Sequence, residues 1–277
     1  MRWVVFLLAA ASLAACDRKA EIQQPKVEAK PVALTYDGAD YKDQAAKIAH
    51  GKRLAVVLDC TGCHGDNLRG QNVTADDPNY GEMNAPNLTL VMAKYDDADF
   101  ARLMRHGVPK DGREFWFMPV ESFQFLSDSD LGAMVAYLRT LKPAGKQLPP
   151  IVKGRGFQAD LDKGIGNAQA QIARYRAHPP VDLGAAYARG RYIAETTCTA
   201  CHNGELQGYD GFTPDLDIAG SYTPEELTRL LTNGEGKVKK NLGLMSVVAK
   251  NHFSQFTPAE RADVVAYIKA RVDRPQP

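Results

Sequence analysis

The chain has 277 residues, which is more than one small domain requires and suits two domains of ordinary size. Hydrophobic residues make up 44% and charged residues 24% of the sequence, a balance typical of globular domains with their own cores. A formal net charge of +1 excludes a strongly basic nucleic-acid-binding protein, so we expect no nucleic-acid partner and recognition through local surface patches.

The first residues of the chain have the pattern of a bacterial lipoprotein signal. Arg2 precedes an apolar run that is too short to cross a bilayer, and a Leu-Ala-Ala-Cys string ends at Cys16. We therefore expect residues 1–15 to be a signal peptide, Cys16 to carry a lipid and residues 16–36 to be a flexible tether. Asp17 then favours the inner membrane, with the protein on its periplasmic face. The alternative is an ordinary signal peptide cleaved nearby, with Cys16 incidental.

The remaining four cysteines form two Cys-x-x-Cys-His strings, the attachment sequence for c-type haem. In such a string the two thiols bond to the porphyrin and the histidine binds the iron. The residues concerned are Cys60, Cys63 and His64 in the first string and Cys198, Cys201 and His202 in the second. A redox dithiol would need a strand-rich setting, and a zinc site would need further cysteines. The sequence therefore predicts two covalently attached haem c groups.

The sequence around the two strings is an internal repeat of helices. In each copy apolar spacing predicts a helix that leads into the string, and capping patterns predict a middle and a final helix. The expected middle helices run from Asp96 to Gly107 and from Thr223 to Gly234, and the final helices open at Ser127 and Thr257. We therefore expect an all-α fold with two tandem domains, at residues 37–143 and 183–277. The linker at 144–182 is expected to be extended, with one short helix over 160–176, and to pack against both domains.

Met118 and Met245 occupy matching positions in the two copies. Met118 lies twelve residues after His106, and Met245 lies twelve residues after Asn233. Met118 also precedes Pro119 in the loop before the final helix. A histidine and a methionine together raise the reduction potential of a haem. We therefore predict that the metal ligands are His64 with Met118 in the first copy and His202 with Met245 in the second.

Histidine ligands on both sides of the iron are the alternative, and they would give haems of lower potential. His106 and His252 are the candidates, but neither has a histidine at the matching position of the other copy. His50 and His178 are expected at the surface or at helix ends. The other methionines after the leader are expected to fill the core, and they are Met83, Met92, Met104 and Met134.

Further residues are expected to support the haems or a partner. Pro86 and Pro214 follow the two strings in matching loops, where a proline carbonyl would accept the proton of the iron-binding imidazole. An ordinary turn is the alternative for these loops. The aromatic residues that would line the haem crevices, or equally a general core, are Phe115, Trp116, Phe117, Tyr137, Phe253, Phe256 and Tyr267. Lys237, Lys239 and Lys240 lie just before the second methionine and favour an acidic partner there.

With these motifs the chain resembles class I cytochromes c over about residues 37–143 and 183–274. The first copy, with Asn87-Leu88-Thr89 and Met118-Pro119, is similar to a domain of the cytochrome c subunits of membrane-bound alcohol and gluconate dehydrogenases. Those subunits carry three haem domains, whereas this chain has two.

The resemblance implies an electron carrier and not an enzyme. It would pass electrons between a dehydrogenase or quinol-oxidising complex and a terminal acceptor, such as an oxidase or another cytochrome. The alternative is a haem enzyme of the dihaem peroxidase type, in which one iron loses its distal ligand to bind peroxide. The matching methionines of the two copies weigh against that alternative.

Overall fold

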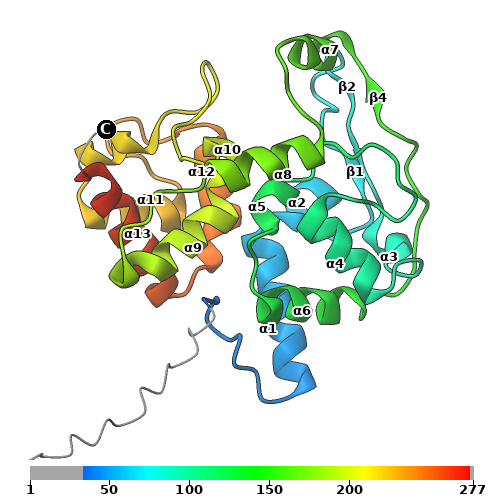
Figure 1. The fold of residues 1–277 in the computed structure, drawn as a ribbon, viewed down its shortest axis with the longest axis horizontal. Coiled ribbons are helices and arrows are strands. Elements are labelled where there is room, and N and C mark those ends of the chain that lie inside the picture. Colours follow the sequence, from blue (N-terminus) through cyan, green and yellow to red (C-terminus); the bar gives the residue numbers. More distant parts are fainter. Residues whose placement is uncertain (1–33, 275–277) are drawn as a thin grey trace, which may run out of the picture. The chain divides into compact units, whose positions relative to one another are not determined.

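The structure is a computed structural model that describes residues 34–274, which lie within one compact unit. The predicted signal peptide and the predicted lipid site at Cys16 lie outside the described residues. Between residues 34 and 274 no helix is both long enough and apolar enough to cross a membrane. Helices dominate the fold and the strands are two residues long (Figure 1). The expected all-α class with two tandem helical copies is confirmed.

The first copy follows the predicted order of helices. Its helices are α1 (Gln44–Val57), α2 (Cys60–His64), α3 (Leu88–Val91), α4 (Asp97–His106), α5 (Val120–Phe123) and α6 (Asp128–Leu138). Two short strands, β1 (Gln71–Asn72) and β3 (Asn84–Ala85), pair antiparallel in the loop after α2, where β2 (Gly81–Glu82) also lies. The first Cys-x-x-Cys-His string is α2 itself, so it begins three residues after α1 ends.

The second copy repeats this order with small changes. Its elements are η1 (Ala185–Tyr187), α9 (Ala188–Thr197), α10 (Thr199–His202), η2 (Leu216–Ser221), α11 (Pro224–Asn233), α12 (Leu244–Asn251), η3 (Phe253–Gln255) and α13 (Pro258–Val272). The second string begins at Cys198, the residue that joins α9 to α10. Both strings therefore stand at the end of the first helix of their copy.

The capping patterns of the sequence produce the expected helix ends. Asp96 and Thr223 form capping boxes at the starts of α4 and α11. Gly107 and Gly234 end these helices in the left-handed region, with φ of 64° and 76°. The expected serine and threonine caps of α6 and α13 are also present. The two copies therefore share one frame of a first, a middle and a final helix.

A glycine allows the first and final helices of each copy to cross in close contact. A Cβ atom on Gly51 of α1 would lie 1.9 Å from the backbone oxygen of Ala133 in α6. A Cβ atom on Gly190 of α9 would lie 2.1 Å from the backbone oxygen of Asp263 in α13. Any larger residue would push these helices apart, so the matching glycines fix the same crossing in both copies.

The linker differs from its prediction. Instead of one helix over 160–176, it contains strand β4 (Val152–Lys153), helix α7 (Arg155–Asp162) and helix α8 (Ala168–Ala177). The break between the helices has a local cause, because Gly164 adopts a left-handed φ of 88° and Asn167 then caps α8. Strand β4 pairs with β2, and α8 packs on α4 and α5 of the first copy. Tyr175 of α8 also donates to the carbonyl oxygen of Thr199 in the second copy, at 2.9 Å, so the linker packs against both copies as expected.

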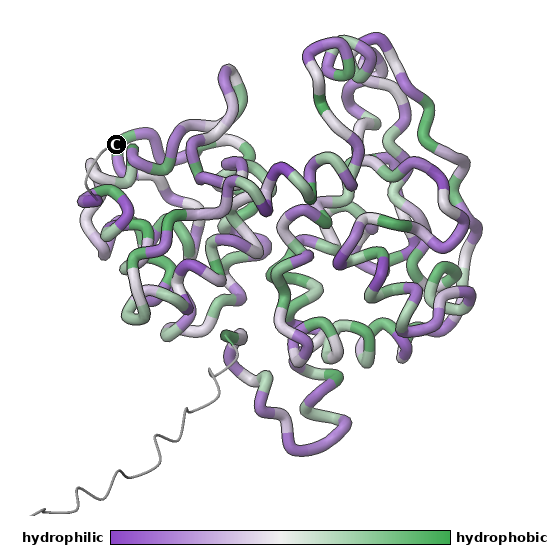
Figure 2. Tube along the Cα trace, in the orientation of Figure 1, coloured by the Kyte–Doolittle hydropathy of each residue, from purple (hydrophilic) through white to green (hydrophobic). Residues whose placement is uncertain are grey.

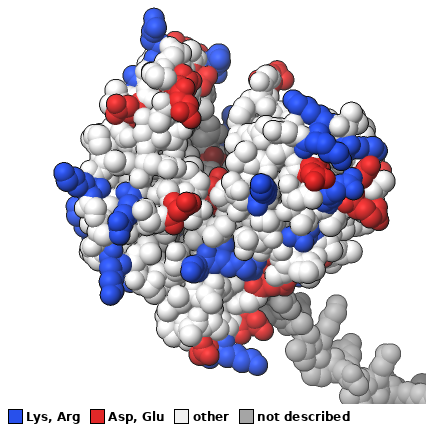
Figure 3. Space-filling view, turned by 180° about the vertical axis from the view of Figure 1, so that it is seen from behind, with Lys and Arg blue, Asp and Glu red and all other residues white. Residues whose placement is uncertain are grey.

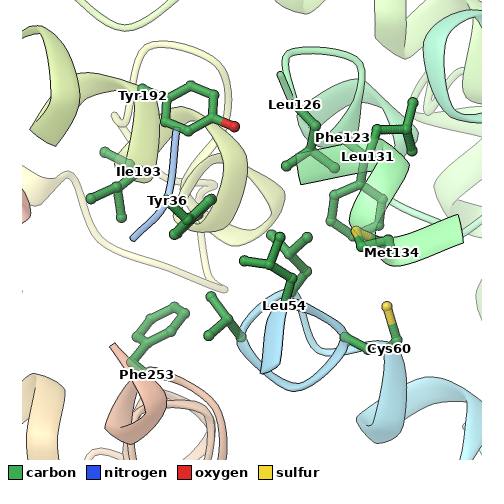
Figure 4. Close-up of a cluster of buried hydrophobic side chains, with 14 of the residues drawn as sticks. Tyr36, Leu54, Cys60, Phe123, Leu126, Leu131, Met134, Tyr192, Ile193 and Phe253 are labelled. Carbon is green, nitrogen blue, oxygen red and sulfur yellow. The ribbon is translucent and has the colours of Figure 1, made fainter. Parts of the chain in front are cut away.

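One hydrophobic cluster extends through both copies. Figure 4 shows Leu54 and Met134 of the first copy together with Tyr192, Ile193 and Phe253 of the second. In Figure 2 apolar stretches of the trace alternate with polar ones along most helices, as expected where one helix face is buried. The copies therefore share a continuous core.

The last residue of the expected tether is also held by this core. Tyr36 is buried, and its backbone N–H donates to Asp130 Oδ2 at 3.1 Å. Its hydroxyl lies 2.7 Å from Thr196 Oγ1 of the second copy. The last residue of the expected tether thus contacts both copies.

Candidate functional site

The two Cys-x-x-Cys-His strings carry all four cysteines that the structure describes, and all four are free thiols. Burial raises the pKa of Cys60 to about 12 and that of Cys63 to about 11, with the charge of Asp59 adding to both. Burial likewise raises the pKa of Cys198 to about 11. Thiols that stay protonated at neutral pH are poor nucleophiles, which argues against a catalytic redox dithiol.

Both strings lie at the boundary between the two copies. Thr199, inside the second string, has its Oγ1 2.7 Å from Oγ of Ser122 in the first copy. Asp59, directly before the first string, has its Oδ1 2.9 Å from Nε2 of His252 in the second copy. The fold therefore brings to one boundary two motifs that are separated by 138 residues between Cys60 and Cys198.

The histidines of the two strings are oriented in the same way. His64 Nδ1 lies 2.8 Å from the carbonyl oxygen of Pro86, and His202 Nδ1 lies 2.9 Å from that of Pro214. Because a carbonyl only accepts, Nδ1–H is the donor and Nε2 is left free to bind a metal. Burial lowers the pKa of both histidines, which favours the neutral imidazole that a metal requires. The hydrogen bonds expected of the two proline carbonyls are present.

The loops that hold these prolines are fixed differently in the two copies. In the first copy, the buried Asn87 side chain donates to the carbonyl oxygen of Ala144, at 2.7 Å. In the second copy the matching residue is Asp215, which accepts from the buried Arg271 at 3.0 Å. Sequence reasoning missed Arg271, although the change from Asn87 to Asp215 is a signal that a cation lies opposite the second loop.

Met118 and Met245 lie at the edge of the shared core, partly buried, whereas the other four described methionines are fully buried. A left-handed residue redirects the chain just before each of them. Phe117 has φ of 67°, and Gly243 has φ of 63°. Met118 lies in a loop as expected, but Met245 lies in the first turn of α12. A partly buried thioether beside the core suits a ligand, and fully buried methionines suit packing.

The histidine alternatives are in other environments. His106 is exposed at the end of α4, and His178 is exposed at the end of α8. His252 is buried, and both of its ring nitrogens have partners, Val56 O and Asp59 Oδ1, each at 2.9 Å. The surface position expected for His50 is wrong. It is buried, because its Nε2 lies 2.7 Å from Asp130 Oδ1, a partner 80 residues away in the sequence.

The aromatic residues expected at the haem crevices divide into two groups. Trp116 and Phe117 contact Phe157 of α7, with ring centroids 5.5 and 5.1 Å apart. In the second copy Phe253 and Phe256 are buried and stack on each other at 5.0 Å. The aromatic residues before Met118 are therefore packed by the linker.

The lysines before Met245 also have different environments. Lys237 Nζ lies 3.2 Å from Glu226, as Lys110 Nζ lies 2.6 Å from Asp99 at the matching positions of the first copy. The ion pair of Lys237 is therefore a feature that both copies of the repeat share. The neighbouring Lys239 is exposed. On the face shown in Figure 3, basic and acidic side chains are interspersed, and no patch of one charge covers the whole face.

These residues fit a covalently bound haem. Each string presents two free thiols and a neutral histidine with a free Nε2, and a partly buried methionine follows in each copy. The residues that would hold the group are those of the two strings together with Met118 and Met245. When bound, haem supplies an iron that changes reversibly between Fe(III) and Fe(II).

The helical frame and its attachment strings thus define a protein that holds covalently bound haem. The chain belongs to the cytochrome c family, whose family model matches residues 48–142 and 187–271. Haem c is the cofactor of this family and electron transfer is its general role, and the expected family is confirmed.

Several curated proteins are similar to the chain. The fructose dehydrogenase cytochrome subunit of Gluconobacter japonicus is 23% identical over 253 residues, which are 80% of this chain and 52% of that protein. The gluconate 2-dehydrogenase cytochrome c subunit of Pantoea cypripedii is 24% identical over 280 residues, covering 84% and 61%. One of the subunits of the nicotinate dehydrogenase of Pseudomonas putida is 29% identical over 170 residues, covering 57% and 14%. The chain thus spans less than two thirds of the length of these relatives.

Proposed function

We propose that the protein is a dihaem electron carrier that links a dehydrogenase or quinol-oxidising complex to a terminal acceptor. The observation that carries this proposal is the duplicated site. Both copies present free thiols, an oriented histidine and a partly buried methionine within one compact unit. A haem iron held by a histidine and a methionine would have no open position for a substrate.

The names of the relatives support a dehydrogenase as the electron donor. Three of the similar proteins are cytochrome subunits of fructose, gluconate and alcohol dehydrogenases. In this proposal His64 and Met118 bind the first iron, and His202 and Met245 bind the second. The acceptor would be an oxidase or another cytochrome.

We also propose that the mature protein is anchored by a lipid on Cys16 to the periplasmic face of the inner membrane. The support is the sequence alone, namely the short apolar leader and the Leu-Ala-Ala-Cys string. Cys16→Ser should move the protein from the membrane fraction to the soluble periplasm, and mass spectrometry of the wild-type N-terminus should show acyl chains. Recovery of an unmodified N-terminus elsewhere in the leader would contradict the anchor.

Spectroscopy of the purified holoprotein tests the carrier. We expect two haems per chain, and in the oxidised protein the methionine–iron charge-transfer band at the red end of the visible spectrum. Met118→Ala and Met245→Ala should each remove about half of that band, and Met104→Ala, at a fully buried methionine, should leave it intact. A high-spin haem that binds carbon monoxide in the wild type and turns over peroxide would support the dihaem peroxidase alternative instead.

A further inference from the structure

The two copies contact each other through residues at matching positions. Ser122 and His252 each lie five residues before the cap of the final helix, which is Ser127 in the first copy and Thr257 in the second. Each follows the predicted distal methionine of its own copy. Both side chains reach the haem-attachment turn of the other copy.

Ser122 makes the first of these contacts. Its Oγ lies 2.7 Å from Oγ1 of Thr199, and both residues are fully buried. The Thr199 hydroxyl donates its single proton to the carbonyl oxygen of Glu195 at 2.6 Å, so Ser122 is the donor to Thr199. Thr199 lies between Cys198 and Cys201, inside the second attachment string. The distal segment of the first copy therefore holds the attachment turn of the second.

His252 makes the reciprocal contact. Its Nδ1 lies 2.9 Å from the carbonyl oxygen of Val56, and its Nε2 lies 2.9 Å from Asp59 Oδ1. Asp59 directly precedes Cys60 and adopts a left-handed φ of 58°. Its carboxylate lies over Gly62, where an added Cβ would come within 1.8 Å of Oδ1. The distal segment of the second copy therefore holds the attachment turn of the first.

A second pair of matching contacts fixes the frame around these turns. Arg53 and Tyr192 each lie two residues after the crossing glycine of their first helix. Arg53 binds Glu260 at the cap of α13 through two contacts, of 2.8 and 2.9 Å, and Tyr192 donates to Asp130 at the cap of α6 at 2.7 Å. Both carboxylates are buried, and each contact joins one copy to the other. The two copies are thus related by matching contacts in both directions.

We propose that Ser122 and His252 are positioning residues for electron transfer between the two haem sites. The inference rests on the proposed function, since it requires a haem at each string. In the transfer one electron leaves Fe(II) in one site and reduces Fe(III) in the other, and no bond is formed or broken. Because such a transfer depends steeply on distance, contacts that hold each attachment turn against the opposite copy set its rate.

The experiment compares the wild-type holoprotein with Ser122→Ala, His252→Gln and the double variant. After partial photoreduction, the redistribution of the electron between the haems is followed by absorbance. We expect the inter-haem rate to fall several-fold in each single variant and further in the double variant, with two haems and both methionine bands retained. His178→Ala, at an exposed helix end, is the matched control and should keep the wild-type rate.

A pH series separates positioning from general stability. Nδ1 faces the Val56 carbonyl, which only accepts, and Nε2 forms an ion pair with the Asp59 carboxylate, so the His252 ring makes both contacts only when it is protonated. The inter-haem rate of the wild type should therefore fall as the pH rises above neutral, and that of His252→Gln should stay flat. An unchanged rate in the double variant, with both haems present, would overturn the inference.

If the double variant loses a haem, Ser122→Ala decides the question, because it removes a single hydroxyl. An unchanged rate in that variant overturns the inference, and a slower rate supports it. Failure of the proposed function looks different, since the wild type would then lack a second haem or show no transfer at all.

Discussion

The two copies have the same helical frame but differ in what covers the segment around the predicted distal methionine. In the first copy α8 packs on α5, and Val120, two residues after Met118, is 0% exposed. In the second copy the matching Val247 is 51% exposed, and Val238 in the preceding loop is 89% exposed. The same repeat therefore occurs in two environments. The linker covers the segment after Met118 in the first copy, and the matching segment after Met245 in the second copy is exposed.

The largest expected effect comes from removing one haem at a time. Cys198→Ser with Cys201→Ser should leave one haem per chain, and so should Cys60→Ser with Cys63→Ser. A ligand that binds only the folded state stabilises it, and the linker covers the distal segment of the first copy but not that of the second. We therefore expect loss of the second haem to lower the melting temperature more. Haem content and thermal unfolding measure this, and equal destabilisation would contradict the difference in support.

The cover of the first copy can be removed directly. Phe157→Ala deletes a fully buried ring that contacts Trp116 and Phe117, so it should cost about 3 kcal/mol of folding free energy. Val238→Ala in the second copy should change stability by less than about 0.5 kcal/mol, because that side chain is exposed. Denaturant unfolding measures both, and similar costs would show that the linker is not a structural cover.

The glycine crossings test what the copies share. Gly51→Ala and Gly190→Ala should each destabilise the protein by about 1–3 kcal/mol, because the added methyl meets backbone at 1.9 and 2.1 Å. Gly132→Ala is the control within α6, where an added Cβ has no neighbour closer than 3.8 Å. It should instead stabilise the helix by about 0.5–1 kcal/mol. Opposite signs in thermal unfolding are the expected result, and equal signs would refute the close crossing.

The two contacts between copies should respond differently to pH. Burial alone would lower the pKa of His252, but Asp59 and the Val56 carbonyl together raise it above its ordinary value of 6.5. The stability that this contact contributes is therefore complete below pH 6.5 and is lost as the pH rises through the raised pKa. The Ser122–Thr199 contact has no titrating group.

A melting-temperature series measures this difference. The difference in melting temperature between wild type and His252→Gln should shrink as the pH rises. The difference between wild type and Ser122→Ala should stay constant. A gap that grows with pH for His252→Gln would show that the ring is not protonated in the folded protein.

The smallest effect on stability is expected at the exposed lysines. Lys239→Glu with Lys240→Glu should leave unfolding unchanged but slow reduction by an acidic redox partner several-fold at low ionic strength. Arg113→Glu, at the position in the first copy that matches Lys240, is the control. Equal slowing by both changes would contradict a partner that approaches the second copy.

Local patterns allowed most of the frame to be predicted. These patterns are short motifs that act within a few residues, namely the attachment strings, the capping boxes and the glycines that end helices. The proline carbonyls followed from the matching loops. The linker was predicted less well because Gly164 ends a helix that apolar spacing alone would continue.

Long-range pairs could not be predicted. The burial of His50 depends on Asp130, and the contacts of His252 depend on a turn 193 residues earlier, at Asp59. Arg271 is buried because Asp215 lies opposite it in the fold. From its neighbours in the sequence each of these residues would be interpreted as a polar surface residue. The folding of one copy brings His50 and Arg271 to their partners, and the packing of the two copies brings His252 to its partner.

A redox titration of the purified holoprotein, followed by absorption spectroscopy, tests the dihaem electron carrier most directly. We predict two one-electron steps, each from half of the bound haem. Both haems should be low-spin and show the methionine band in the oxidised state. A single step with one haem per chain, or a haem that is high-spin and binds carbon monoxide in either copy, would contradict it.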